Sequence, residues 1–169
     1  MQGFSLAKPI KIGSKASLPK YHRKQVLEFI GRKPSSWMYG HVDAVCLPSS
    51  LIGIHKQPIQ NLNRESNGTR WIDKETVSVP DMPFGRGSIG NHTDDMTGLT
   101  LLILLYCEPW VAKNRHPEYN GHNGEFISGD KVIEMEVGDA IVFDDRVPHA
   151  WLTNSAWAFA VFPLIAAKI

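Results

Sequence analysis

Residues 90–95 read Gly-Asn-His-Thr-Asp-Asp, and residues 137–149 read Val-Gly-Asp-Ala-Ile-Val-Phe-Asp-Asp-Arg-Val-Pro-His. Between its Gly-Asp turn and its final turn, the second stretch contains a short apolar run that is typical of a β-strand, and a new strand is expected to begin at His149. Alternate side chains of a strand share a face, so His92 and Asp94 are expected to point the same way. The two stretches together favour a β fold with polar side chains aimed at one site.

Short apolar segments alternate with turn residues on both sides of these stretches. The pattern predicts strands at 41–47, 99–106, 125–127, 131–137, 140–143, 149–152 and 157–162, with one or two more within 69–79. A helix is expected at 20–30, ended by Gly31 and Pro34. Residues 48–68 are expected to be mainly loop, and 80–90 a connector. Many short strands separated by turns indicate a mainly β barrel or sandwich with the helix packed outside.

The run at 99–106 is apolar almost throughout, which is typical of a strand buried on both faces. Strict alternation places one set of its side chains on each side. The first expected set is Leu99, Leu101, Ile103 and Leu105, and the second is Thr100, Leu102, Leu104 and Tyr106.

His92 and Asp94 offer one imidazole and one carboxylate to a single metal ion. The best candidate for a third ligand is His149, because a side chain that follows a short turn can be held rigidly at the start of a strand. Two histidines and one carboxylate form the facial triad of non-haem Fe(II) oxygenases, which leaves positions open for substrate and O₂. Asp95 is expected to point to the opposite face.

In sequence, His92-Thr-Asp94 followed by His149 resembles the HxD…H signature of Fe(II)/2-oxoglutarate-dependent oxygenases. Asn123-Gly-Glu-Phe126 is similar to a strand opening that this family carries between its ligands, and 137–143 resembles its approach to the distal histidine. The resemblance covers about residues 85–163 and implies a double-stranded β-helix, a jelly-roll or cupin-like barrel. It extends loosely to the TET/JBP-like branch, whose members act on nucleic acids.

The resemblance implies Fe(II) as cofactor and 2-oxoglutarate as a small-molecule co-substrate. Family members usually hold the far carboxylate of 2-oxoglutarate with Arg or Lys, about ten residues beyond the distal histidine or on the strand after HxD. Here the corresponding segments, 157–161 and 101–107, contain no basic residue. Arg86 is therefore nominated as the anchor, because glycines on both sides let the chain bend near a ligand, with Arg70 or Lys168 as alternatives.

Two other functions fit the same residues. The first is a cupin-like metalloenzyme that shares the barrel but does not use 2-oxoglutarate, which the missing basic residue favours. The second is a non-catalytic β-barrel binding module in which the histidines and the aspartate are structural.

Composition limits the remaining possibilities. The 169 residues are expected to form a single domain, 1–169, with a basic N-terminal arm at 1–19. Residues 1–33 carry eight basic side chains and one acid within a chain of net charge +1. Such a segment can contact nucleic acid or another polyanion, but a solvated, partly flexible arm is the favoured explanation, because terminal charge runs are usually of that kind. Two cysteines, no apolar run long enough to cross a bilayer and no signal-like segment favour a cytoplasmic or nuclear protein; the oligomeric state stays open.

Overall fold

The structure is a computed structural model that describes residues 10–13, 21–65, 70–73, 80–94, 98–108 and 124–167. Its helices are α1 (Tyr21–Ile30), α2 (Lys56–Glu65) and the short 3-10 turns η2 (Pro34–Ser36) and η3 (Ser49–Leu51). Its strands are β1 (Ile10–Gly13), β2 (Val42–Cys46), β3 (Arg70–Asp73), β4 (Asp81–Arg86), β5 (Ile89–His92), β6 (Leu99–Cys107), β7 (Gly124–Ser128), β8 (Lys131–Met135), β9 (Ala140–Asp144), β10 (His149–Leu152) and β11 (Ala156–Ala167).

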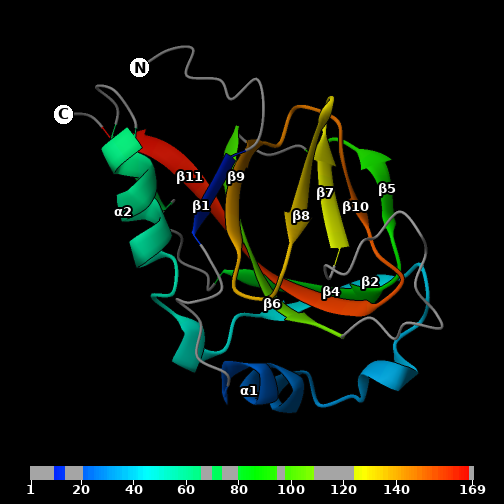
Figure 1. Cartoon of the computed structure of the whole chain (residues 1–169). Coiled ribbons are helices and arrows are strands. Elements are labelled where there is room, and N and C mark those ends of the chain that lie inside the picture. The colour runs from blue at the N-terminus through cyan, green and yellow to red at the C-terminus, as the bar shows by residue number, and fades with distance from the viewer. Residues whose placement is uncertain are drawn as a thin grey trace.

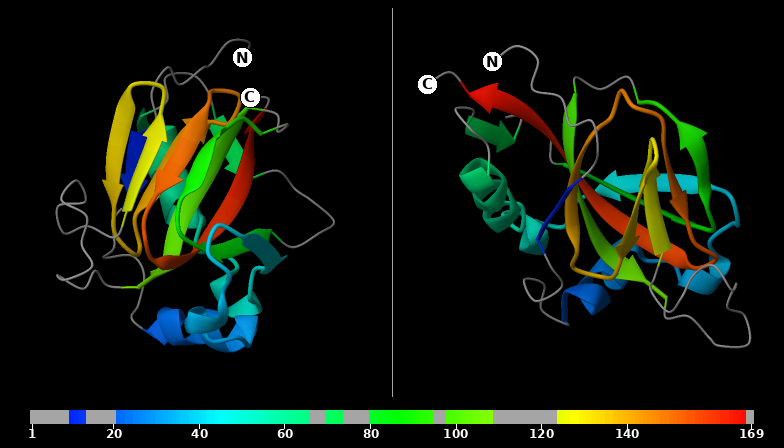
Figure 2. Two further views of the ribbon diagram at one scale, coloured as in Figure 1. Left: turned by 90° about the vertical axis from the view of Figure 1, so that its right-hand side faces the viewer. Right: turned by 45° about the horizontal axis from the view of Figure 1, so that its top comes forward.

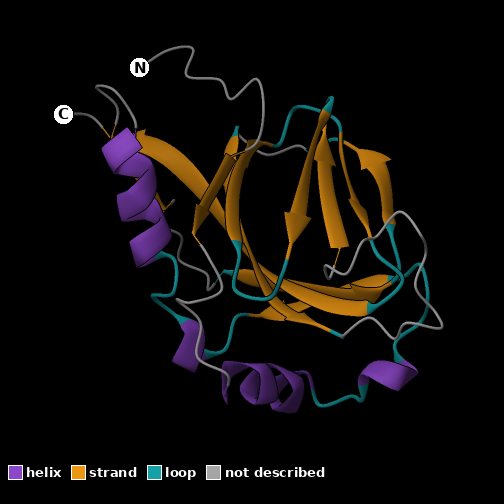
Figure 3. Cartoon of the chain, in the orientation of Figure 1, coloured by secondary structure: helices purple, strands orange, loops and turns teal. Residues whose placement is uncertain are grey.

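The strands form two antiparallel sheets. The larger sheet has the order β1-β9-β6-β11-β4-β2, with β3 also paired to β11, and the smaller has the order β5-β10-β7-β8. The sheets face each other as two layers (Figures 1 and 2). The helices lie outside the strands (Figure 3). This arrangement confirms the prediction of a mainly β, jelly-roll-like fold with external helices.

Buried side chains form two layers. The inner layer lies between the sheets and consists of Leu102, Leu104, Cys107, Phe126, Ile133, Met135, Ile141, Phe143, Trp151, Trp157 and Phe159. The outer layer lies on the other face of the larger sheet, where Val26 of α1 and Leu62 of α2 pack with strand residues such as Leu101. Strand β6 contributes to both layers and is buried along its whole length, as its sequence predicts.

A β-bulge changes the facing of the last residues of β6. Tyr106 pairs with Ala158 of β11. The next pair joins Leu104 to Phe159, which leaves Leu105 as an extra residue. The predicted alternation therefore holds up to the bulge and is wrong beyond it, because Tyr106 joins the outer layer.

Two segments that the sequence predicts to be irregular contain a helix and strands. The segment 48–68, predicted to be mainly loop, holds helix α2, whose Ile59 and Leu62 are buried three residues apart on one face. Its other residues are mostly polar, and this weakens the helical signal. The supposed connector at 80–90 holds β4 and the start of β5. Pro83 is tolerated there because the pairing of β4 with β11 covers only 84–86.

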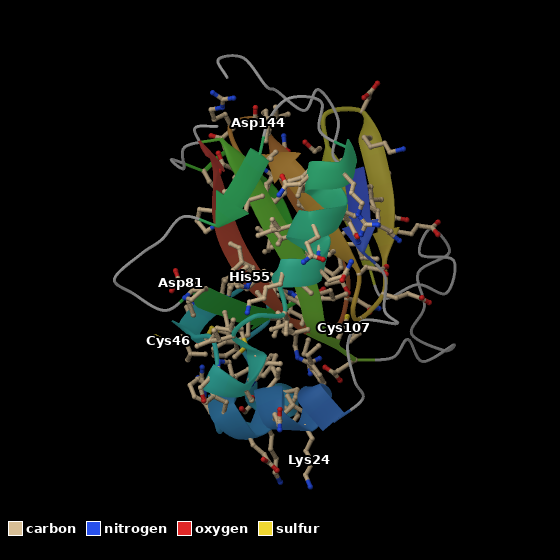
Figure 4. All side chains as sticks on the ribbon, turned by 90° about the vertical axis from the view of Figure 1, so that its left-hand side faces the viewer. Lys24, Cys46, His55, Asp81, Cys107 and Asp144 are labelled. Atoms are coloured by element: carbon tan, nitrogen blue, oxygen red, sulfur yellow. The ribbon has the colours of Figure 1, made fainter. Side chains whose placement is uncertain are left out.

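The barrel also uses strands that precede residue 85. Within the N-terminal arm, β1 pairs with β9, and Lys11 Nζ lies 3.0 Å from the Asp139 carboxylate. Arg32 is likewise paired, with Asp43 at 2.9 Å. Lys24 projects from α1 away from the strands (Figure 4), and its Nζ lies 3.9 Å from the Glu28 carboxylate. Contact of these basic residues with nucleic acid stays a prediction. None of the helices in the described part of the chain is long and apolar enough to span a membrane.

Candidate metal centre

Two neighbouring strands bring together the three residues predicted to bind a metal. His92 is the last residue of β5 and His149 is the first of β10, and the two are direct partners in the antiparallel register. Asp94 follows β5 by two residues, so it extends the same face. The structure thus places His92, Asp94 and His149 in one group, called here the His–Asp–His cluster.

The donor atoms of the cluster converge. One ligand atom from each residue lies within 4.8 Å of the other two. His149 Nε2 lies 3.0 Å from Asp94 Oδ2, and His92 Nε2 lies 3.6 Å from Asp94 Oδ1. His149 is buried, while the side chains of His92 and Asp94 are 39% and 40% exposed, so the cluster has one open side. This set of two imidazoles and a carboxylate fits a divalent transition metal.

Backbone carbonyls fix the orientation of both imidazole rings. His92 Nδ1 donates to the Gly90 carbonyl at 2.7 Å, and His149 Nδ1 donates to the Val147 carbonyl at 2.8 Å. Because a carbonyl oxygen only accepts, each Nδ1 carries the proton, and the lone pair of the neutral ring is on Nε2. Both lone pairs therefore face the cluster, as they do in metal-binding histidines whose other ring nitrogen donates to a carbonyl.

The turn between β9 and β10 sets the position of His149. Asp144 accepts hydrogen bonds from the Arg146 backbone N–H at 3.0 Å and from its guanidinium at 2.9 and 2.7 Å. These bonds from Arg146 lower the pKa of Asp144, although burial opposes them. Asp144 lies at the end of the barrel opposite α1 (Figure 4). The charges of Asp144 and Arg146 are therefore paired within the turn.

The next residue of the turn, Asp145, is buried and links the turn to the cluster. Its carbonyl accepts from the Asp94 backbone N–H at 3.0 Å, and its own N–H donates to the Gly98 carbonyl at 2.9 Å. Its side chain accepts from the Thr100 hydroxyl at 2.8 Å. Burial raises the pKa of Asp145, an effect that the hydrogen bond from Thr100 opposes. The local sequence pattern gives no signal for this contact, so Asp145 was not among the residues predicted for the site.

The cluster opens into a cavity of about 600 Å³ between the sheets. The cavity is lined mainly by apolar side chains from both sheets: Val42, Ala44, Pro83, Ile89, Leu102, Phe126, Phe143, Ala150, Trp151, Trp157, Phe159 and Val161. Its polar lining consists of the cluster, Thr100 and Asp81. A cavity of this size and character suits a small organic ligand. In the part of the wall that the structure describes, there is no lysine, arginine or tyrosine.

Arg86, the predicted anchor for a co-substrate, lies elsewhere. Asp81 and Pro83 of β4 line the cavity, and alternation along the strand turns Arg86 to the opposite face. Its guanidinium donates to Glu108 Oε1 at 2.8 Å and to the Pro34 carbonyl at 3.1 Å. The structure therefore does not bring Arg86 to the cluster, and its charge is already paired.

The two alternative anchors for the co-substrate, and Asp95 beside the cluster, lie wholly or partly outside the described residues. Lys168 and Asp95 are not described, and neither is the side chain of Arg70.

Sequence reasoning also missed Val42 and Ala44 of β2 as parts of the cavity wall. The alternating pattern of an edge strand was the available signal, but it does not show which cavity the strand lines.

No protein-family model and no curated protein sequence matches the chain. Among solved structures, an oxidoreductase of the 2OG-Fe(II) oxygenase family from Burkholderia pseudomallei is similar, with a TM-score of 0.55, 11% sequence identity, and coverage of 92% of this chain and 83% of that chain. A Pseudomonas putida prolyl-4-hydroxylase has a TM-score of 0.51 and 14% identity, with coverage of 92% and 90%. At these identities the likeness shows a shared fold. It does not support the TET/JBP-like branch, which stays a prediction.

Proposed function

We propose that the protein is a non-haem Fe(II)-dependent oxygenase that uses a 2-oxo acid as co-substrate. The observation that carries this proposal is the His–Asp–His cluster, with both Nε2 lone pairs and a carboxylate turned to one point at the wall of an apolar cavity. The fold shared with a solved oxidoreductase of the 2OG-Fe(II) oxygenase family and with a solved prolyl-4-hydroxylase supports it. 2-Oxoglutarate is the member of the co-substrate class that the sequence resemblance implies.

Each residue of the cluster has a definite part in the proposed reaction. His92, Asp94 and His149 would hold Fe(II), which supplies the activation of O₂ when bound. The carbonyls of Gly90 and Val147 keep the two rings in the tautomer that binds metal. The apolar and aromatic side chains of the wall offer few polar partners beside the ion, which favours binding of an apolar part of a substrate there.

A second candidate is a cupin-like metalloenzyme that does not use a 2-oxo acid. One observation favours it: the described part of the cavity wall offers no cation to the far carboxylate of 2-oxoglutarate. A buried carboxylate without a partner loses its hydration and gains nothing in return.

Anaerobic titration separates these candidates. Protein loaded with Fe(II) is mixed with 2-oxoglutarate and then with 2-oxohexanoate, and the visible spectrum is recorded. We expect a weak charge-transfer band with at least one of them, and loss of bound iron in His92→Ala and His149→Ala. Bound iron with no band from either acid would favour the cupin-like candidate. Failure of the wild-type protein to take up metal would favour the non-catalytic binding module.

A further inference from the structure

We propose that the free edge of β2 binds an extended polypeptide as an added strand, with a basic side chain of that polypeptide directed at Asp81. This inference rests on the proposed function, because it names a polypeptide as the substrate class of the same cavity.

Strand β2 is both the end of the larger sheet and part of the cavity wall. It is last in the strand order, so one of its edges has no neighbouring strand among the described residues. Val42 and Ala44 line the cavity, and both are exposed to solvent. On the neighbouring strand β4, Asp81 lies opposite Cys46 and also lines the cavity (Figure 4). The edge of β2 therefore borders the side on which the cavity is open.

The backbone groups of alternate β2 residues point away from the sheet. The Leu47 N–H donates to the Pro80 carbonyl at 2.7 Å, and the register of β2 with β4 continues without a shift. Hydrogen-bonded and non-hydrogen-bonded pairs alternate along an antiparallel ladder, so Asp43 and Val45 bond to β4. The residues whose N–H and C=O groups point outward, with no partner among the described residues, are Val42, Ala44 and Cys46.

The other ends of the two sheets are less suited to a further strand. Strands β1 and β5 have four residues each, and their registers with β9 and β10 shift. On β8, the Glu134 carbonyl already accepts from Lys11 Nζ at 3.1 Å. Strand β2 has a regular register and contains neither lysine nor proline. A regular edge without such protection is the kind to which another polypeptide adds, through main-chain hydrogen bonds.

The carboxylate of Asp81 supplies the charge that selects among polypeptides. It is exposed on the cavity side and forms no ion pair with a described residue, whereas Asp43, on the other face of β2, is paired with Arg32 and His41. A polypeptide residue opposite Cys46 would lie two strand spacings from Asp81 on the same face, about 10 Å away. A lysine or arginine side chain can extend across Cys46 to the carboxylate, which would repel an acidic one.

Amide hydrogen exchange measured by NMR tests the edge. The probe is a capped heptapeptide of alternating threonine and valine with lysine at its centre, and its twin has glutamate there. Without peptide we expect fast exchange at Val42, Ala44 and Cys46 and slower exchange at Asp43 and Val45. The lysine peptide at saturation should slow exchange at the first three at least fivefold. The glutamate peptide should bind roughly 1.4- to 5-fold more weakly, the range that corresponds to one exposed ion pair.

Two variants separate the backbone from the charge. Ala44→Pro removes one outward N–H and should weaken both peptides by roughly 2- to 13-fold, the range that corresponds to one hydrogen bond. Asp81→Asn should lose the preference for the lysine peptide and keep the protection pattern. Its matched control is Asp43→Asn, which removes a carboxylate from the opposite face of β2 and should keep the preference. The Asp81 comparison stands even if the proline variant does not fold.

The outcomes distinguish this inference from the proposed function. Unchanged exchange with both peptides would overturn the inference alone, since these measurements need no metal. Protection that grows with protein concentration without peptide would assign the edge to a second copy of the chain and overturn it too. Equal affinities for the two peptides in the wild-type protein would remove Asp81.

Cobalt tests whether the docked peptide lies at the proposed site. In Co(II)-loaded protein, the paramagnetic ion should broaden the NMR signals of the bound lysine peptide. Bound peptide without broadening would overturn its role as substrate. Protection of the β2 amides in a protein that takes up no metal would overturn the proposed function, and the substrate role with it, while peptide docking at β2 would stand.

Discussion

Replacing Asp94 by Asn should remove about half or more of the stability that the protein gains from a divalent metal. Asn is nearly isosteric with Asp, and the Asp94 side chain is 40% exposed, so the metal-free fold should be little affected. Metal at 100 times its Kd stabilises a protein by about 2.7 kcal/mol. For a domain of 150–250 residues this corresponds to a rise in Tm of roughly 5–10 °C.

The loss follows from the same relation. Substitution of residues that hydrogen-bond to metal ligands already weakens metal affinity by about 10- to 100-fold. Loss of the only carboxylate of the cluster should weaken the affinity at least as much. At the same metal concentration the stabilisation then falls to about 1.4 kcal/mol for a tenfold weaker site and about 0.4 kcal/mol for a hundredfold weaker one.

The assay is thermal unfolding of the wild-type and Asp94→Asn proteins with and without Co(II), followed by circular dichroism. Asp81→Asn is the matched control, because Asp81 is a carboxylate that lines the same cavity outside the cluster. It should keep the full cobalt-induced shift. Equal shifts in the wild-type and Asp94→Asn proteins, or an equal loss in Asp81→Asn, would refute the reasoning.

Three further predictions concern packing and pH. Gly124→Ala should destabilise the fold by about 1–3 kcal/mol in urea unfolding and alter the near-ultraviolet signal of Trp151, because its Cβ would overlap that ring; an unchanged spectrum would contradict the tight contact. Leu104→Ala should cost about 2–5 kcal/mol in the same assay, since Leu104 is fully buried between the sheets; a cost below 1 kcal/mol would mean that the inner layer repacks. Arg146→Met should lower the stability of the protein at neutral pH. The difference in unfolding free energy from the wild type should shrink as the pH falls below 3.8, the ordinary pKa of Asp144, and through the lowered pKa of Asp144 in the folded state, because protonation of Asp144 removes the ion pair. A difference that grows as the pH falls would contradict this.

Local patterns in the sequence were enough for the strands after residue 90 and for placing His92 and Asp94 on one face. Because side chains alternate between the two faces of a strand, His92 and Asp94 lie on one face wherever that strand pairs. The apolar run of β6 must likewise be buried, whichever strands it pairs with. The same patterns failed for α2 and β4, where few apolar residues mark the buried face.

Features that depend on the pairing of distant segments were decided only by the tertiary structure. The bulge in β6 turns Tyr106 to the outer layer because β11 pairs with β6 one residue out of step. The facing of β4 between β2 and β11 turns Arg86 away from the cavity, and the packing of β10 against β7 leaves the Trp151 N–H without an acceptor among the described residues. The sequence alone therefore determined that His92 and Asp94 share a face, through a spacing that is local, whereas His149 joins them only because β5 pairs with β10. The contents of the cavity wall depend on which side chains face inward when remote strands meet, and no local spacing specifies that.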